Sequence, residues 1–322
     1  MTILGSFDFP LVKLNSEFFF WECDTLLFAD GRISNRSRDG SNQVVIDTAP
    51  KLAVLEIRVR SESEQVFTSE VVVGYAGASA LVALSVLTFA GQILKNLKGE
   101  TLPNIDQVAA FIGEAFKASL HEYSENIHTA LNMAAVLCMF DVTAQKTMRR
   151  QVSVVCRDGA YHADVSEPVS ALSLVSGPDP EALDSQIVSA LKNDSNKVDA
   201  EYGILREVEL HARAHSNGKP FGGQLQICRI GTFGVKLAAT QFWDFSYRGP
   251  GLPSNWNDGD YRTLLLGYDV SDLRVGQCDF VPDEICLLPD SDKTSWAKKA
   301  MKSEPRPFDN DDFFSVPRRG IF

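Results

Sequence analysis

The uncharged stretch VVVGYAGASALVALSVLTFAGQIL, from Val71 to Leu94, decides the fold class of this 322-residue chain. It opens with three β-branched valines, which favour a strand, and Gly74 and Gly77 follow where a strand can turn into a helix. From Leu81 onward, leucines recur near the α-helical period. The run is long enough to cross a membrane, but no second candidate span accompanies it. We therefore expect a buried strand, a turn and a buried helix, and no membrane segment.

Further elements surround this unit in an order that indicates the fold. Two hairpins are expected before it, one from Phe18–Trp21 and Thr25–Ala29, the other from Leu52–Val59 and Val66–Val73. After it we expect helices starting at Asn104, Glu181 and Val198, and strands at Ala134–Phe140, Val152–Cys156, Ala160–Val165, Leu172–Val175, Leu225–Ile230 and Val235–Phe242. The order of strands, two helices, strands, two helices and strands predicts an α+β fold. Two antiparallel sheets would stack between helix layers in a four-layer αββα sandwich.

The composition excludes several classes of function. There are 31 basic and 42 acidic residues, the net charge is −11, and no basic patch is present, so nucleic acid and anionic membranes are not expected as partners. The six cysteines include no CxxC pair, which favours a reducing, cytoplasmic location. Neither a phosphate-binding loop nor a dinucleotide fingerprint is present, so no cofactor is expected. His211 and His215 have a zinc-compatible spacing but no further ligand, so we interpret them as solvated and expect no metal.

The chain divides by composition into three regions. Residues 1–15 are interpreted as an N-terminal segment or propeptide, and residues 16–247 as the αββα domain. From Arg248 the sequence is rich in turn formers, and Asp309–Asp312 lies in a polar end. Residues 248–322 are therefore expected to be a C-terminal extension with a flexible tail, partly ordered by Leu264–Leu266 and Ile285–Leu288.

Short segments in the first third of the chain resemble a known family. Phe28–Ser34 contains an Ala-Asp-x-Arg turn after a strand, Lys51 opens the next strand, and Gly74–Ala78 enters the first helix. Together with Val175-Ser176-Gly177 and Gly222-Gly223, these segments look like those of proteasome β-subunits and the bacterial HslV peptidase. The resemblance covers about residues 16 to 245. It implies an N-terminal nucleophile (Ntn) hydrolase with a proteasome-like sandwich.

The resemblance also implies roles for individual residues. A terminal Thr or Ser hydroxyl would attack a carbonyl while its own α-amine takes the proton. Lys51 would be the lysine that favours the deprotonated amine and hydroxyl, and Asp30 would hold that lysine. The backbone N–H of Gly77 would donate to the oxyanion.

The sequence leaves the nucleophile open. Counting back from Asp30 by the family's spacing reaches Leu14, which is no nucleophile. A shorter hairpin would make it Ser16, whereas Thr2, exposed if Met1 is removed, requires a long insertion in the first hairpin. The positions that would order the amine in the family hold Gly218 and Phe221 here.

Two functions of different class follow. The first is a threonine or serine peptidase or amidase that uses Asp30, Lys51, Gly77 and either Thr2 or Ser16. The second is a catalytically inactive protein of the same fold that acts in assembly or as an interaction scaffold. The resemblance implies a homo-oligomer in both cases, and peptide or protein substrates and an ATPase partner in the first.

Overall fold

The computed structural model describes residues 2–9, 23–36, 42–46, 49–77, 79–177, 180–193, 203–208, 211, 225–232, 234–244, 260–266, 268–269, 274–275, 278–279 and 285–287. Within these ranges, no helix combines the length and apolar character needed to cross a membrane.

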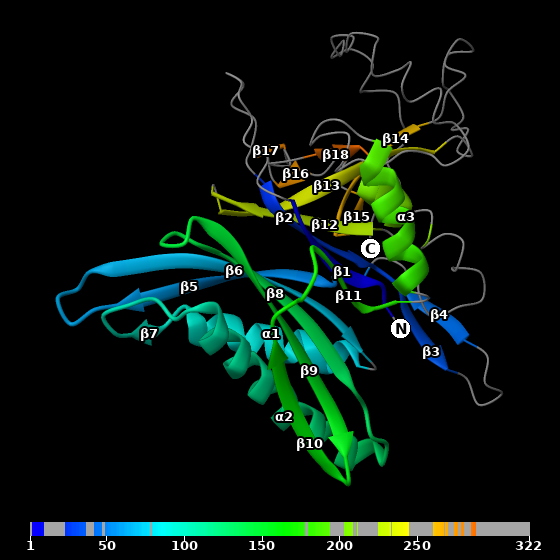
Figure 1. Ribbon diagram of the computed structural model, residues 1–322. Helices are drawn as coiled ribbons and strands as arrows, with labels where there is room; N and C mark the ends of the chain where they lie inside the picture. The colour runs from blue at the N-terminus through cyan, green and yellow to red at the C-terminus, as the bar shows by residue number, and fades with distance from the viewer. Residues whose placement is uncertain are drawn as a thin grey trace.

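The first of two large sheets, the β1 sheet, contains the N-terminal strand. Its described strands are β1 (Leu4–Asp8), β2 (Cys23–Asp30), β11 (Leu172–Ser176), β12 (Leu225–Gly231), β13 (Gly234–Asp244), β14 (Asp260–Leu265), β15 (Tyr268–Asp269) and β18 (Ile285–Leu287). They run in the order β11-β1-β2-β12-β13-β14-β15, and β18 also pairs with β13 (Figure 1). All pairs are antiparallel except β13 with β18.

The second large sheet, the β6 sheet, contains the Val71–Leu94 unit. Its strands are β5 (Leu52–Arg60), β6 (Val66–Gly77), β7 (Leu97–Lys98), β8 (Met133–Asp141), β9 (Lys146–Arg157) and β10 (Ala160–Ser166), in the order β10-β9-β8-β6-β5-β7. Two small ladders pair β3 (Ile33–Arg36) with β4 (Asn42–Ile46) and β16 (Arg274–Val275) with β17 (Cys278–Asp279).

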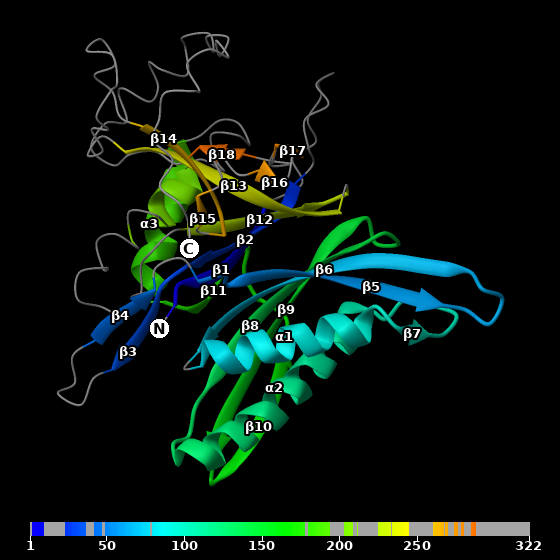
Figure 2. The same ribbon diagram turned by 180° about the vertical axis from the view of Figure 1, so that it is seen from behind.

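Two helices cover the outer face of the β6 sheet (Figure 2). Helix α1 (Ala80–Leu94) begins after Ser79, whose hydroxyl accepts a hydrogen bond from the backbone N–H of Val82. Helix α2 (Ile105–Ile127) begins with a capping box between Asn104 and Gln107. On the β1 sheet, α3 (Pro180–Asn193) and helical residues 203–208 supply the packing side chains.

Three separate cores show how these layers stack. One lies between α1, α2 and the β6 sheet and includes Val73 and Phe116. A second lies between the two sheets and includes Leu4 and Val136. A third lies between the β1 sheet and its helices and includes Phe28. Three cores require four layers, so the predicted αββα sandwich is confirmed.

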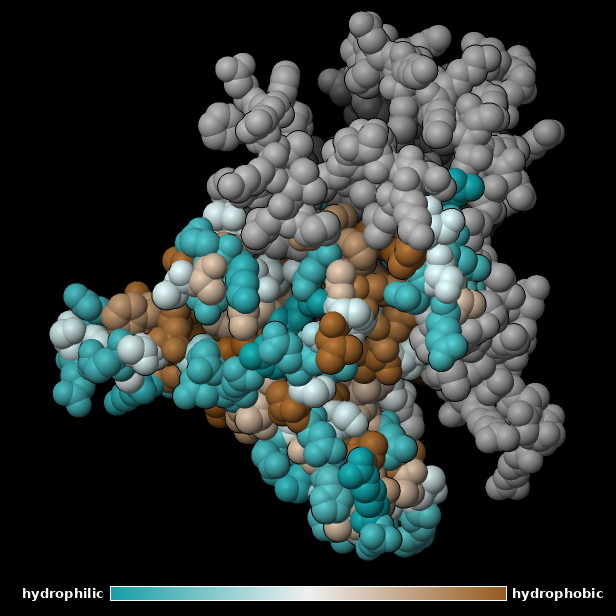
Figure 3. All heavy atoms as spheres, in the orientation of Figure 1, coloured by the Kyte–Doolittle hydropathy of each residue, from teal (hydrophilic) through white to brown (hydrophobic). Residues whose placement is uncertain are grey.

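Successive side chains divide between these cores, as strand geometry requires. On β2, Leu26 and Phe28 face the helices and Leu27 and Ala29 face the other sheet. On the face drawn in Figure 3, hydrophilic residues predominate at the lower end, formed by β9, β10 and α2, and hydrophobic residues gather toward the middle.

The predicted first hairpin is wrong. Over Thr25–Ala29, strand β2 pairs with β1 on one side and β12 on the other, and Phe18–Trp21 lies outside the described residues. Residues 2–9, assigned above to a leading segment, supply β1 in the interior of the sheet. The second predicted hairpin is confirmed as β5 and β6.

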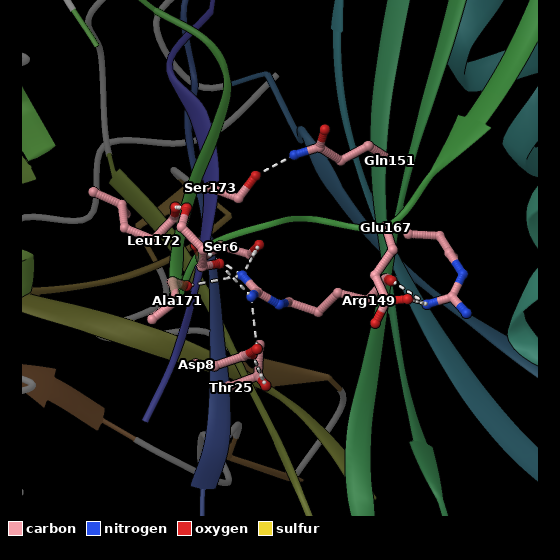
Figure 4. Close-up of polar contacts among 11 residues, drawn as sticks. Ser6, Asp8, Thr25, Arg149, Gln151, Glu167, Ala171, Leu172 and Ser173 are labelled. Carbon is pink, nitrogen blue, oxygen red and sulfur yellow. Dashed lines mark hydrogen bonds and ion pairs between the residues drawn. The ribbon is translucent and has the colours of Figure 1, made fainter. Parts of the chain in front are cut away.

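The two sheets are also joined by polar contacts around Arg149 on β9 (Figure 4). Its guanidinium donates to the Ser6 hydroxyl at 2.9 Å, to the carbonyls of Ser170 and Ala171, and pairs with Asp8 at 2.6 Å. Ser6 and Asp8 both lie on β1, so a single buried cation fixes β1 against the β6 sheet.

Candidate functional site

The end of β2 brings Asp30 beside the start of the chain. The backbone N–H of Asp30 donates to the carbonyl of Ile3 at 3.0 Å, which places Thr2 next to this contact along the chain. Thr2 and Asp30 are both buried, each with about 1% of its surface exposed. The connection between β1 and β2 comprises residues 9–22. A nucleophile at Thr2 requires a long insertion between these two strands, and this connection has the necessary length.

The short segment Ala49-Pro50-Lys51 lies against the end of β2. Every backbone N–H and carbonyl group of this segment makes a hydrogen bond. The N–H of Ala49 donates to the carbonyl of Gly31 at 2.9 Å, and its carbonyl accepts from the Gln226 amide at 2.7 Å. The Pro50 carbonyl accepts from the Tyr75 hydroxyl at 2.8 Å. Lys51 donates its N–H to Gln226 Oε1 at 2.7 Å and accepts from the Tyr75 N–H at 3.1 Å. A buried backbone satisfied in this way has a fixed position.

Burial controls the electrostatics of Lys51. Its side chain is buried, and the ammonium nitrogen lies 5.0 Å from the centre of the Tyr75 ring, within the range of a cation–π contact. Burial lowers the pKa of Lys51, and the negative charge of Asp30 opposes this shift. Burial raises the pKa of Tyr75 to about 12, so this phenol stays neutral at physiological pH.

Gly77 ends β6, two residues after Tyr75, and has a φ of +157°. A Cβ atom at this position would lie 2.7 Å from the carbonyl oxygen of Asn132, closer than real Cβ contacts. The backbone where the chain enters β8, at Asn132 and Met133, therefore approaches β6 too closely for any residue larger than glycine. Gly77 itself is exposed, and its strand leads directly into the N-terminus of α1.

Gln226 and Tyr75 are site residues that sequence reasoning missed. Gln226, on β12, has 1% of its surface exposed, and its amide contacts both ends of the Ala49–Lys51 segment. The signal was a glutamine at an inward position between Leu225 and Ile227, because a buried amide requires polar partners.

Several positions that the sequence singled out for the site are not among the residues described. Ser16, Gly218, Phe221 and the Gly222-Gly223 pair lie outside the described residues.

The histidine interpretation needs a correction. His211 is buried and not solvated, with 3% of its surface exposed, while His215 lies outside the described residues. No group of three His, Cys, Asp or Glu side chains in the described part of the chain is arranged to hold a metal ion.

Comparison with known proteins gives structural similarity only. No family model and no curated protein matches the chain. Among solved structures, Anbu (ancestral beta-subunit) from Yersinia bercovieri is 12% identical with a TM-score of 0.45, over 73% of this chain and 86% of that one. An Anbu (Gly-1) mutant from Hyphomicrobium sp. strain MC1 is 14% identical with a TM-score of 0.42, over 73% and 85%. Anbu from the same strain is 14% identical with a TM-score of 0.40, over 72% and 84%. The four-layer fold follows from the three cores of the chain itself, independently of this similarity.

Proposed function

We propose that this chain is an Ntn amide hydrolase or peptidase whose nucleophile is Thr2. The observation that carries the proposal is the burial of Thr2, Asp30 and Lys51 where the start of β1, the end of β2 and the segment before β5 meet. Buried ionisable groups are a typical feature of catalytic sites, because burial tunes their proton affinity.

Each residue has a role that its position supports. With Met1 removed, the hydroxyl of Thr2 attacks the substrate carbonyl and its α-amine takes the proton. The Lys51 ammonium favours the deprotonated amine and hydroxyl, and the Asp30 carboxylate balances its charge. The exposed Gly77 N–H is the proposed oxyanion donor, a contact whose loss typically costs about 3 to 4 kcal/mol of barrier.

Thr2 is preferred to Ser16 because of the strand pairing. Strand β1 runs antiparallel to β2 from Leu4 opposite Ala29 to Asp8 opposite Thr25, so Thr2 stands at the same end of the ladder as Asp30. The free amine that the mechanism needs then arises by removal of one residue.

The test is turnover of fluorogenic peptide reporters by Lys51→Met, which removes the charge and retains much of the side-chain volume. We expect a loss of about 10²- to 10⁴-fold, the usual contribution of a proton-transfer group. Lys95→Met is the matched control, since Lys95 is exposed and pairs at 3.9 Å with Glu56. Equal activity of Lys51→Met and wild type would refute the assignment.

The second candidate is an inactive protein of the same fold that serves assembly. Gly218 and Phe221, in place of the polar residues of the resembled family, favour it. The intact mass of the purified protein separates the two candidates. Retention of Met1 would block the Thr2 amine and support the assembly function, whereas loss of Met1 alone would leave Thr2 free to act.

Assembly and location are part of the proposal. Helix α1 exposes Leu81, Leu84, Phe89 and Ile93, and Val71–Leu94 carries no charge, which supports contact with a second copy of the chain. We propose a homo-oligomer in the cytoplasm, with peptide or protein substrates and an ATPase as a further partner.

A further inference from the structure

The amide of Gln226 uses all of its hydrogen-bond donors. Its oxygen accepts from the Lys51 N–H at 2.7 Å, and its nitrogen donates to the carbonyls of Ala49 at 2.7 Å and Leu266 at 3.2 Å. A side-chain amide has two N–H donors, so both are occupied. Rotating the amide by half a turn would set its NH₂ group against the Lys51 N–H and its oxygen against two carbonyls. The three partners therefore fix one orientation.

One of these partners comes from the C-terminal region. Leu266 lies in the turn between β14 and β15, which is closed by the pairing of Leu265 with Tyr268. Its φ is +51°, a left-handed conformation that is uncommon for leucine. Its side chain packs against the core between the sheets. A residue holds such a conformation only where its surroundings require it, and such positions occur often at functional sites.

We propose that the β14–β15 turn positions Lys51 through the side chain of Gln226, which makes the C-terminal region a working part of the candidate site. Leu266 orients the amide, the amide holds the N–H of Lys51 and the carbonyl of Ala49, and this backbone sets where the ammonium lies relative to Asp30. Gln226 and Leu266 are positioning residues. Only the catalytic consequence of this positioning rests on the proposed function.

The readout is the titration midpoint of the Lys51 amine in the full-length protein. It is followed by NMR of protein labelled with ¹³C at the lysine ε-carbon, and the Lys51 signal is assigned by its loss in Lys51→Met. Burial lowers the pKa of Lys51. Among the described residues, the titratable groups shown to act on its ammonium or contact it are Asp30 and Tyr75. If the 49–51 segment is released, the ammonium gains solvent and its midpoint rises toward the ordinary lysine value of 10.5.

One pair of variants tests the Gln226 contact and a second pair tests the Leu266 contact. Gln226→Leu removes the amide, and we expect the midpoint of Lys51 to rise. Gln151→Leu is its control, because Gln151 is a partly buried glutamine of β9 that donates to Ser173. Leu266→Pro cannot adopt a positive φ and should raise the midpoint, whereas Leu266→Asn loses the same side chain but tolerates this φ and should leave it unchanged.

The outcomes separate this inference from the proposed function. An unchanged midpoint in Gln226→Leu would overturn the inference. So would equal effects of Leu266→Pro and Leu266→Asn, because the turn conformation would then be irrelevant. A wild-type protein without turnover would refute the hydrolase, but the four midpoints would still decide whether the turn controls Lys51. Where turnover exists, kcat should fall with the rise in midpoint, and an unaltered kcat would refute a catalytic consequence.

Discussion

The Asp8 carboxylate lies between two partners at the middle of the sandwich. One oxygen accepts from the Thr25 hydroxyl at 2.7 Å, and the other lies 2.6 Å from the Arg149 guanidinium. The Arg149 side chain is 5% exposed and that of Asp8 38%, so the arginine depends on its partner more than the reverse. This ion pair places polar atoms in the layer between the two sheets, which is otherwise mostly apolar.

We predict that Asp8→Asn destabilises the protein by about 1 to 2 kcal/mol, because a buried guanidinium loses its counter-charge but keeps its carbonyl acceptors. Urea unfolding at neutral pH measures the change. Glu56→Gln breaks an equally short ion pair with Arg58, at 2.6 Å but on the surface, and should cost less than about 0.5 kcal/mol. Equal costs for the two variants would show that burial does not strengthen the Asp8 contact.

The burial of Lys51 determines the direction in which the stability of the protein changes with pH. The pKa of Lys51 is lowered in the folded protein from an ordinary value of 10.5, so between these two values the unfolded chain binds more protons. Stability therefore rises with pH through this window. We expect the unfolding free energy of wild type to increase relative to that of Lys51→Met as the pH rises toward 10.5. A constant difference would mean that Lys51 titrates like an exposed lysine.

At the scale of elements, glycines set how closely strands approach. A Cβ atom on Gly74 of β6 would lie 2.6 Å from a methyl carbon of Leu4 on β1 and 3.1 Å from Leu52. Gly91 lies in α1, where a Cβ atom would meet Leu55 at an ordinary 3.6 Å. The same substitution therefore has opposite effects at the two positions.

We predict that Gly74→Ala destabilises the protein by about 1 to 3 kcal/mol through overpacking between the sheets. Gly91→Ala should stabilise it by about 0.5 to 1 kcal/mol, because alanine favours a helix interior. Thermal and urea unfolding of the two variants provide the measurement. Destabilisation by both variants would argue against the difference in packing.

These elements show which parts of the fold a sequence can predict. The β6–α1 unit was predictable because its apolar pattern is local. The pairing of β9 with β10 was predictable because the strands are joined by Asp158-Gly159, a dipeptide that favours positive φ, and both residues adopt it, at 52° and 78°. Strand β1 was missed because Gly5, Ser6 and Asp8 make it look polar. Its polar side chains are matched by Arg149, far away in the sequence.

The candidate site, like the fold, contains some residues that the sequence could predict and others that it could not. Asp30, Lys51 and Gly77 follow from a resemblance of short segments, each next to a strand end. Gln226 could not be assigned a role from sequence, because its partners lie in two stretches far from it along the chain, Ala49–Lys51 and Leu266, which only the fold brings together. Long-range contacts of this kind leave only a local sign, a polar residue at an inward strand position.

At the scale of the whole molecule, charge and apolar surface are distributed unevenly. The chain carries a net charge of −11, yet Val71–Leu94 contains no charged residue. Helix α1 exposes Leu81 by 64% and Phe89 by 51%. Two copies that meet through this face bring no charged side chain of the Val71–Leu94 stretch into the contact, which limits the local repulsion between chains of this net charge.

We predict that sedimentation velocity detects a homo-oligomer of the wild-type chain, and that Leu81→Glu shifts it toward a smaller species by placing a charge on this face. Val142→Glu is the matched control, because Val142 is 72% exposed in the connection between β8 and β9, on a different element. A wild-type chain that stays monomeric at all concentrations would refute self-association. Dissociation of both variants to the same extent would show that added negative charge, and not the α1 face, controls assembly. Since α1 begins three residues after Gly77, an oligomer joined through this helix would also hold the proposed oxyanion donor close to a subunit contact.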